Sequence, residues 1–174
     1  IRHDLHREPE LSFQEARTAA LVAERLAQWG YAVTRDVGGH GVVGTLAIGD
    51  GRRSVAIRAD LDALPLQEET DLPYASRRPG VMHACGHDGH TTMLLGAARR
   101  LAGRRRFCGT VHLVFQPAEE AGKDSGAQRM IADGLFERFP CDAIFGLHNH
   151  PGGAVGTFLF GSGPLMSASD TVHI

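Results

Sequence analysis

The chain has 174 residues, 43% of them hydrophobic and 22% charged, which is an ordinary composition for one sizeable globular domain. A formal net charge of -2 argues against a nucleic-acid binder, and no apolar run approaches the roughly 18 residues of a membrane span. Three cysteines match no small disulfide scaffold, so we expect a reducing compartment and a cytoplasmic protein.

The first half of the chain predicts one helix followed by extended segments. Ser12 is a candidate N-cap, and Glu15 three places on would complete a capping box. Apolar residues then recur at helical spacing until Gly30, which fits a C-cap. Gly49-Asp50-Gly51 is typical of a tight turn between two strands. The extended segments are expected at Tyr31–Arg35, Val42–Ile48 and Ser54–Arg58.

The second half alternates helices with strands. Helices are predicted over Thr92–Leu101, closed by Gly103, and over Gly126–Ala132. Strands are predicted over Thr110–Phe115 and Ala143–Leu147, and another begins in Ser169–Ile174. This alternation predicts an α/β fold with a mixed, largely parallel sheet flanked by helices on both faces.

The ionisable clusters follow the ends of the predicted strands. In open α/β sheets, ligands bind beyond the carboxyl ends of the strands. We therefore expect the clusters to meet at one edge of the sheet. Cys85 and His87, which stand just before a predicted helix, are expected at the same edge. The residues concerned are Asp60, Asp62, Cys85, His87, Glu119, Glu120 and His148.

Cys85-Gly86-His87 places a thiol and an imidazole two residues apart. In extended backbone such side chains point to the same side, and both suit zinc, while imidazole also suits other transition metals. Taken alone, this spacing equally fits a structural cysteine beside a surface histidine. With Glu119, Glu120 and His148 on the same edge, a metal site is favoured.

Adjacent side chains in extended backbone point in opposite directions, so Glu119 and Glu120 are expected to have different tasks. One carboxylate would bind metal, and the other would face the substrate water as a base. The alternative interpretation is a pair of solvated loop glutamates.

Several other polar residues keep two interpretations. Asp60 and Asp62 would either orient ligand histidines by hydrogen bonds or form a turn before Pro65. Asp88 would either support the site or cap the following helix. Ligand, supporting and substrate-contact roles stay open for His83, His90 and His150, whereas structural roles are expected for His3, His6 and His112.

The motifs together resemble a known family. The chain is similar to the amidohydrolase branch of the aminoacylase and carboxypeptidase-G-like metallopeptidases, which includes hippurate hydrolases and indole-acetyl-amino-acid hydrolases. The resemblance spans nearly the whole chain and rests on LHREPEL (5–11), DLDALP (60–65), MHACGHDGH (82–90), FQPAEE (115–120) and IFGLH (144–148).

The resemblance implies a zinc-peptidase-like catalytic domain with two divalent metal ions, which hydrolyses N-acyl amino acids. Zinc or manganese is expected, and cobalt or nickel also suits such donors. The metals would polarise the amide carbonyl and activate a water molecule. Glu119 would be the general base, and the ligands would be Cys85, His87, Glu120 and His148.

Members of this family also carry a lid and dimerisation domain, after which the chain returns and brings one more ligand histidine. The resemblance therefore implies that residues 1–174 are the N-terminal part of the catalytic domain. We expect such a fragment to have an incomplete metal site and little activity, and the longer protein to be a homodimer through its lid.

Three other functions compete with the amidohydrolase. A non-catalytic metal-binding or interaction domain would tolerate the loss of Glu119, whereas an enzyme would not. A zinc deaminase lacks support, because no P-C-x-x-C element is present. A hydrolase with Cys85 as nucleophile and His87 beside it would survive chelation.

Overall fold

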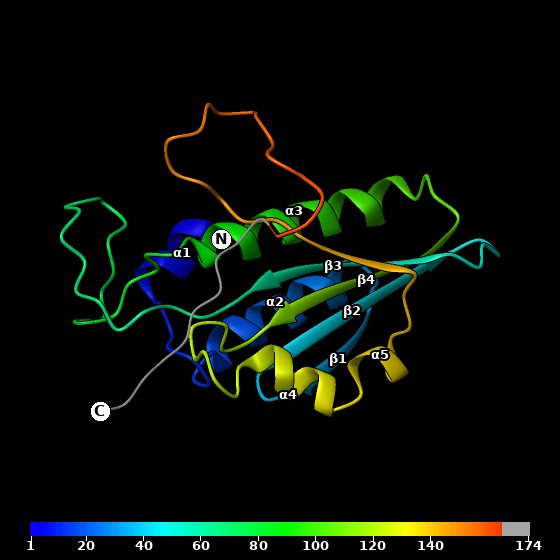
Figure 1. The fold of residues 1–174 in the computed structure, drawn as a ribbon, viewed down its shortest axis with the longest axis horizontal. Helices are drawn as coiled ribbons and strands as arrows, with labels where there is room; N and C mark the ends of the chain where they lie inside the picture. The colour runs from blue at the N-terminus through cyan, green and yellow to red at the C-terminus, as the bar shows by residue number, and fades with distance from the viewer. Residues whose placement is uncertain (165–174) are drawn as a thin grey trace.

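A computed structural model describes residues 1–164, so the strand expected at Ser169–Ile174 lies outside the described residues. Within them, one five-stranded mixed sheet carries helices on both faces, as predicted (Figure 1). The strands are β1 (Ala32–Val37), β2 (Gly41–Ile48), β3 (Ser54–Asp60), β4 (Gly109–Gln116) and β5 (Ala143–Gly146). The helices are α1 (Arg2–Arg7), α2 (Ala16–Gln28), α3 (His87–Arg104), α4 (Gly126–Ala132) and α5 (Leu135–Arg138).

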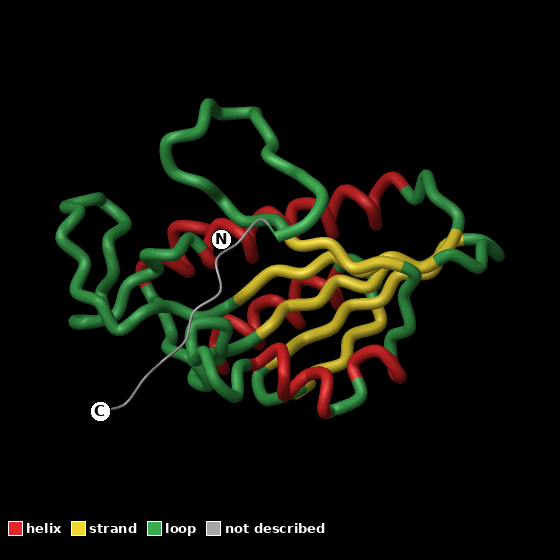
Figure 2. Tube along the Cα trace, in the orientation of Figure 1, coloured by secondary structure: helices red, strands yellow, loops and turns green. Residues whose placement is uncertain are grey.

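The strand order is β1-β2-β4-β3-β5. The first three strands pair antiparallel, and β4, β3 and β5 pair parallel. The parallel strands thus end at the same edge, which is the arrangement on which the expected site depends. Figure 2 shows the two long connections, residues 61–86 and 147–164, leaving the sheet at that end.

The turn at Gly49-Asp50-Gly51 exists, but it does not join neighbouring strands, because β4 lies between β2 and β3. Gly49 and Gly51 instead let the backbone of the turn lie close to Cys108. A Cβ on Gly51 would lie 2.6 Å from the Cys108 carbonyl carbon, and one on Gly49 would lie 2.9 Å from Cys108 Sγ. The turn therefore crosses the start of β4, and glycine allows its backbone to do so.

The capping box predicted at the start of the first long helix is wrong. Helix α2 begins at Ala16, and its N-cap is Glu15. The Ser12 hydroxyl donates to Asp62 Oδ2 at 2.7 Å, while the Glu15 carboxylate accepts from the Ala118 N–H at 2.7 Å. Both side chains thus bind loops at the carboxyl edge of the sheet rather than the end of their own helix.

Apolar side chains fill both faces of the sheet. Helices α2 and α3 cover one face, where Leu26, Leu95 and Phe115 are fully buried or nearly so. Helices α4 and α5 cover the other, around Val114 and Met130. The later part of strand β4 is buried on both faces, which accounts for the apolar run Leu113-Val114-Phe115. In residues 1–164, no helix combines the length and apolarity needed to cross a bilayer.

Two glycine-to-alanine variants test how tightly the edge is packed. A Cβ on Gly126, the first residue of α4, would lie 1.7 Å from the Pro117 carbonyl oxygen, whereas one on Gly96 in α3 meets nothing within 4 Å. We expect Gly126→Ala to lower the free energy of unfolding by roughly 1–3 kcal/mol. Gly96→Ala should raise it by roughly 0.5–1 kcal/mol. Urea unfolding measures both, and equal effects would contradict the packing described.

Candidate metal centre

The structure brings the four predicted ligand residues and the predicted base to one edge of the sheet. Three groups of ligand atoms each lie within 4.8 Å of one another, and all three include His87. The groups are Cys85 with His87 and His148, Asp60 with His87 and His90, and His87 with Glu119 and Glu120. The convergence predicted from the strand ends is therefore present, and metal binding by these residues stays a prediction.

His87 is the first residue of α3, and it follows Gly86, whose φ of 93° is left-handed. Its Nδ1 lies 2.9 Å from the Asp62 carbonyl oxygen and 3.2 Å from Asp62 Oδ1, so Nδ1 carries the hydrogen and donates. That assignment leaves Nε2 as an acceptor. It lies 3.6 Å from the Asp60 carboxylate and 3.8 Å from each of the Glu119 and Glu120 carboxylates. A carboxylate that orients the far nitrogen is the usual support of a metal-binding histidine.

Cys85 and His148 come from separate loops and meet beside His87. Cys85 Sγ lies 3.4 Å from His148 Nε2. Donor atoms on one tetrahedral zinc, with bonds of about 2.0–2.3 Å, are separated by roughly 3.3–3.6 Å. The pair therefore has the spacing of two ligands to one ion.

The backbone between β4 and the two glutamates is bent, not extended as expected. Ala118 has a φ of 46°, and its N–H is held by Glu15. The Glu120 N–H donates to Asp62 Oδ2 at 2.9 Å. Because of this bend, Glu119 and Glu120 both face His87 instead of opposite sides.

Asp60 ends β3 with a side chain that is 1% exposed. Burial raises its pKa, but the hydrogen bond to His90 Nδ1 at 2.6 Å and the Arg58 guanidinium, also at 2.6 Å, outweigh that effect. The pKa of Asp60 falls to about 2, so the carboxylate is ionised at neutral pH. Asp60 and Asp62 thus orient His90 and His87, and turn formation does not describe their contacts.

The remaining histidines and Asp88, whose roles the sequence leaves open or predicts to be structural, differ in where the structure places them. The N-cap interpretation of Asp88 is wrong, because Gly86 precedes the helix and Asp88 lies in its first turn, with its carboxylate on Arg2 and His6. His90 Nε2 contacts Asn149, while His150 is exposed. His112 is buried and hydrogen-bonded to Thr45, as a core histidine should be.

The electrostatics do not suit Cys85 as a nucleophile. Burial, together with the adjacent Glu120 and Glu119 carboxylates, raises the pKa of its thiol to about 12. Reactive cysteines need the opposite environment, in which nearby positive charge lowers the pKa. A divalent cation would supply that charge and favour the thiolate.

The residues fit a divalent cation. Two atoms at the centre, His87 Nε2 and Glu120 Oε1, are buried without a hydrogen-bond partner among the described residues. Burial and the neighbouring Glu120 raise the pKa of Glu119, whose side chain is 41% exposed and accessible to water. Thiol, imidazole and carboxylate groups surround these two unpaired atoms. Zinc and manganese use ligands of these kinds.

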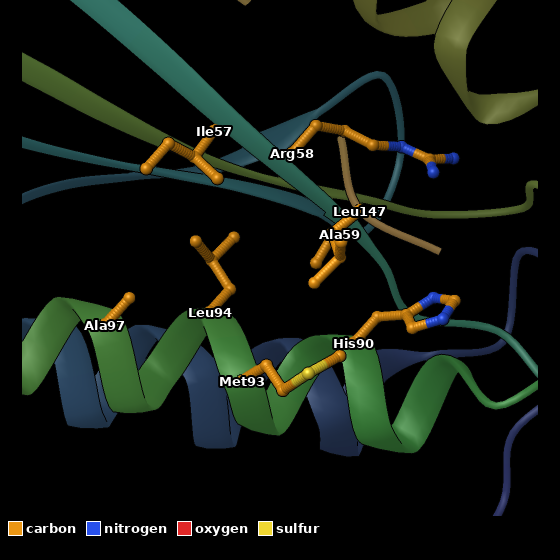
Figure 3. Close-up of a pocket in the computed structure, with 8 residues that line it drawn as sticks. All are labelled: Ile57, Arg58, Ala59, His90, Met93, Leu94, Ala97 and Leu147. Carbon is orange, nitrogen blue, oxygen red and sulfur yellow. The ribbon is translucent and has the colours of Figure 1, made fainter. Parts of the chain in front are cut away.

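An apolar pocket of about 130 Å³ adjoins the centre (Figure 3). It lies between α3 and β3, where Leu94 faces Ile57, and His90 is the residue that it shares with the metal-ligand groups. Neither Cys85 nor Glu119 lines it, so it is separate from the reactive atoms. No sequence pattern predicted this pocket.

The comparison with protein families agrees with the geometry. The sequence model of peptidase family M20/M25/M40 matches residues 56–167, a span that holds every predicted ligand. The chain belongs to this family. The resemblance drawn from the motifs is thereby confirmed.

Individual relatives lie in the amidohydrolase branch. A hippurate hydrolase of Campylobacter jejuni is 52% identical over 174 residues, covering 100% of this chain and 45% of its own length. An IAA-amino acid hydrolase of Arabidopsis thaliana is 47% identical over 149 residues, covering 85% of this chain and 33% of its own. This chain therefore spans less than half the length of these curated relatives.

A solved structure shares the fold. It is a Bacillus subtilis protein described as a dinuclear metal-binding peptidase of the M20 family, with a TM-score of 0.81 and 42% identity. The match covers 87% of this chain and 42% of that chain.

Some contacts at the centre have no signal in the sequence. Ser12 and Glu15 match a capping pattern, which does not indicate the contacts that they make at this edge. Asn149, which contacts His90, stands between two histidines, and that position was the one signal available for it. Contacts between Ser12 and Asp62 or between Glu15 and Ala118 join distant segments, so no local pattern reveals them.

The buried His83 gives a prediction about pH. Its side chain is 4% exposed, and burial lowers its pKa from 6.5 to about 4. Since the unfolded chain binds the proton more tightly, stability should fall as the pH falls from 6.5 to 4, by roughly 3 kcal/mol. In metal-free protein, His83→Leu should flatten this slope and the exposed His3→Leu should leave it unchanged. An unchanged slope in His83→Leu would contradict the assignment.

Proposed function

We propose that this chain forms part of a metal-dependent amidohydrolase that cleaves the amide bond of N-acyl amino acids. The observation that carries the proposal is His87 Nε2, which is buried without a hydrogen-bond partner among the described residues. Asp62 orients it through Nδ1, and a thiol, two imidazoles and three carboxylates surround it. The names of the hippurate and IAA-amino acid hydrolases support the substrate class.

Cys85, His87, Glu120 and His148 are the proposed ligands of two divalent ions, with zinc or manganese favoured and cobalt or nickel as alternatives. When bound, the metals supply Lewis-acid activation of the amide carbonyl and of water. Asp62 holds His87 in the tautomer that leaves Nε2 available. Asp60 holds His90 beside it.

Glu119 is the proposed general base. Its raised pKa brings it nearer to neutral pH, where a base can both take and return a proton. It removes a proton from the attacking water and delivers it to the amide nitrogen as the carbon–nitrogen bond breaks. The products are a carboxylate and a free amino acid.

We also propose that residues 1–174 are the N-terminal part of a catalytic domain in a longer, cytoplasmic protein. The lengths of the relatives, each more than twice that of the matched region, support this proposal. A further ligand histidine and a dimerising lid would come from the remainder. The 174-residue chain alone should then hydrolyse N-acyl amino acids poorly, and a longer chain that includes the remainder should hydrolyse them well.

Replacement of the base separates an enzyme from a metal-binding domain. In the longer chain, Glu119→Gln should keep its metal content and lose about 10²-fold or more in kcat. Glu137→Gln, an exposed glutamate on α5, is the matched control and should keep full activity. Hydrolysis of a panel of N-acyl amino acids and metal analysis measure the two properties. Full activity in Glu119→Gln would contradict the proposed role.

Chelation separates metal chemistry from thiol chemistry. Dialysis of the longer chain against a chelator should abolish hydrolysis, and Zn²⁺ or Mn²⁺ should restore it, because the proposed reaction needs the ions. A thiol hydrolase would keep its activity after the same treatment. Retained activity with no bound metal would contradict the proposal.

A further inference from the structure

Helix α1 inserts one histidine into a buried polar cluster next to the metal centre. His6 is 3% exposed, and it contacts a carboxylate through each ring nitrogen. Its Nδ1 lies 2.8 Å from Asp88 Oδ2, and its Nε2 lies 3.1 Å from Glu68 Oε1. The two carboxylates come from segments 82 and 62 residues away along the chain. His6 is therefore a link between two distant segments.

Each of those segments carries part of the proposed centre. Asp88 directly follows His87 in the first turn of α3. Glu68 belongs to the connection 61–86, which also carries Asp62. Its carboxylate organises this connection by accepting from the Ser76 N–H at 2.6 Å and from the Thr70 hydroxyl. The same two segments meet at the centre, where Asp62 holds His87.

A cation also belongs to this cluster. Each ring nitrogen of His6 faces a carboxylate, and the Arg2 guanidinium lies 2.8 Å from Asp88 Oδ2. Buried ion pairs add little net stability, because desolvation offsets the attraction between the charges. Their hydrogen bonds are directional, however, and fix how the joined segments sit.

We propose that His6 is a positioning residue for the metal centre. By binding Asp88 and Glu68 together, it holds the start of α3 in register with the Asp62 connection and so keeps His87 Nε2 directed at the metal. This inference rests on the proposed function, since it assumes that His87 is a ligand. His6 itself touches neither the predicted ligands nor the proposed base.

A metal titration tests the proposal on the longer chain that includes the remainder, because the 174-residue chain alone is expected to lack one ligand. Zn²⁺ affinity is measured by competition with a chromophoric chelator, and the thermal midpoint of each metal-free variant is measured separately. His6→Gln removes one of the two donors, and we expect Zn²⁺ affinity to fall about tenfold, as it does when residues that orient ligands are lost. His112→Gln is the matched control, because His112 is also buried and hydrogen-bonded but lies within β4.

The control and a second variant make each result decisive. Weaker Zn²⁺ binding in His6→Gln, with near-normal binding in His112→Gln at a similar loss of stability, supports the proposal. If His6→Gln does not fold, the Glu68→Gln variant tests the proposal instead, because this isosteric change weakens the same link. Weaker Zn²⁺ binding by Glu68→Gln supports the proposal, and normal Zn²⁺ binding overturns it. Equal affinities in His6→Gln and the unmodified chain, or equal losses in both histidine variants, would overturn it and leave the proposed function standing. Failure of the unmodified longer chain to bind Zn²⁺ would overturn both this proposal and the proposed function.

Discussion

The contact between Asp62 and His87 is the constraint on which the rest of the centre depends. Asp62 accepts from His87 Nδ1, from the Ser12 hydroxyl and from the Glu120 N–H, so one carboxylate joins four segments of the chain. It directs His87 Nε2 outward, toward the two glutamates. The three groups of ligand atoms all include His87, so the hydrogen bond from Asp62 orients the residue that they share.

The charge distribution explains why a cation suits this place. Asp60, Asp62, Glu119 and Glu120 all lie near His87, and Arg58 is the fixed cation among their contacts in the described residues. Burial lowers the pKa of His87, but the Asp62 hydrogen bond and the carboxylates raise it on balance, and the same crowding raises the pKa of the Cys85 thiol. A divalent ion would relieve this repulsion and replace the proton on the Cys85 thiol. The fold thus holds a concentration of negative charge that a bound cation would offset.

The sequence predicted those features that depend on local pattern and on a general rule of sheets. Helix α4 was predicted with its observed bounds, and the gathering of Cys85, Glu120 and His148 followed from strands that end at one edge. Some errors are local, since α1 and α5 were not predicted and α3 begins at His87 rather than Thr92. The others concern contacts between distant segments. The insertion of β4 between β2 and β3, the bend at Ala118 and the contacts of His6 all depend on tertiary pairing that periodicity and capping patterns do not encode.

The most direct test of the account is X-ray absorption spectroscopy at the zinc edge, on the 174-residue chain loaded with one equivalent of Zn²⁺ and on its Cys85→Ala variant. A sulfur scatterer should appear at about 2.3 Å beside nitrogen or oxygen scatterers at about 2.0–2.1 Å, and the sulfur should vanish in Cys85→Ala. Bound zinc with only nitrogen and oxygen neighbours in the unmodified chain, or a sulfur signal that persists in the variant, would contradict the claim that these side chains converge on a metal ion.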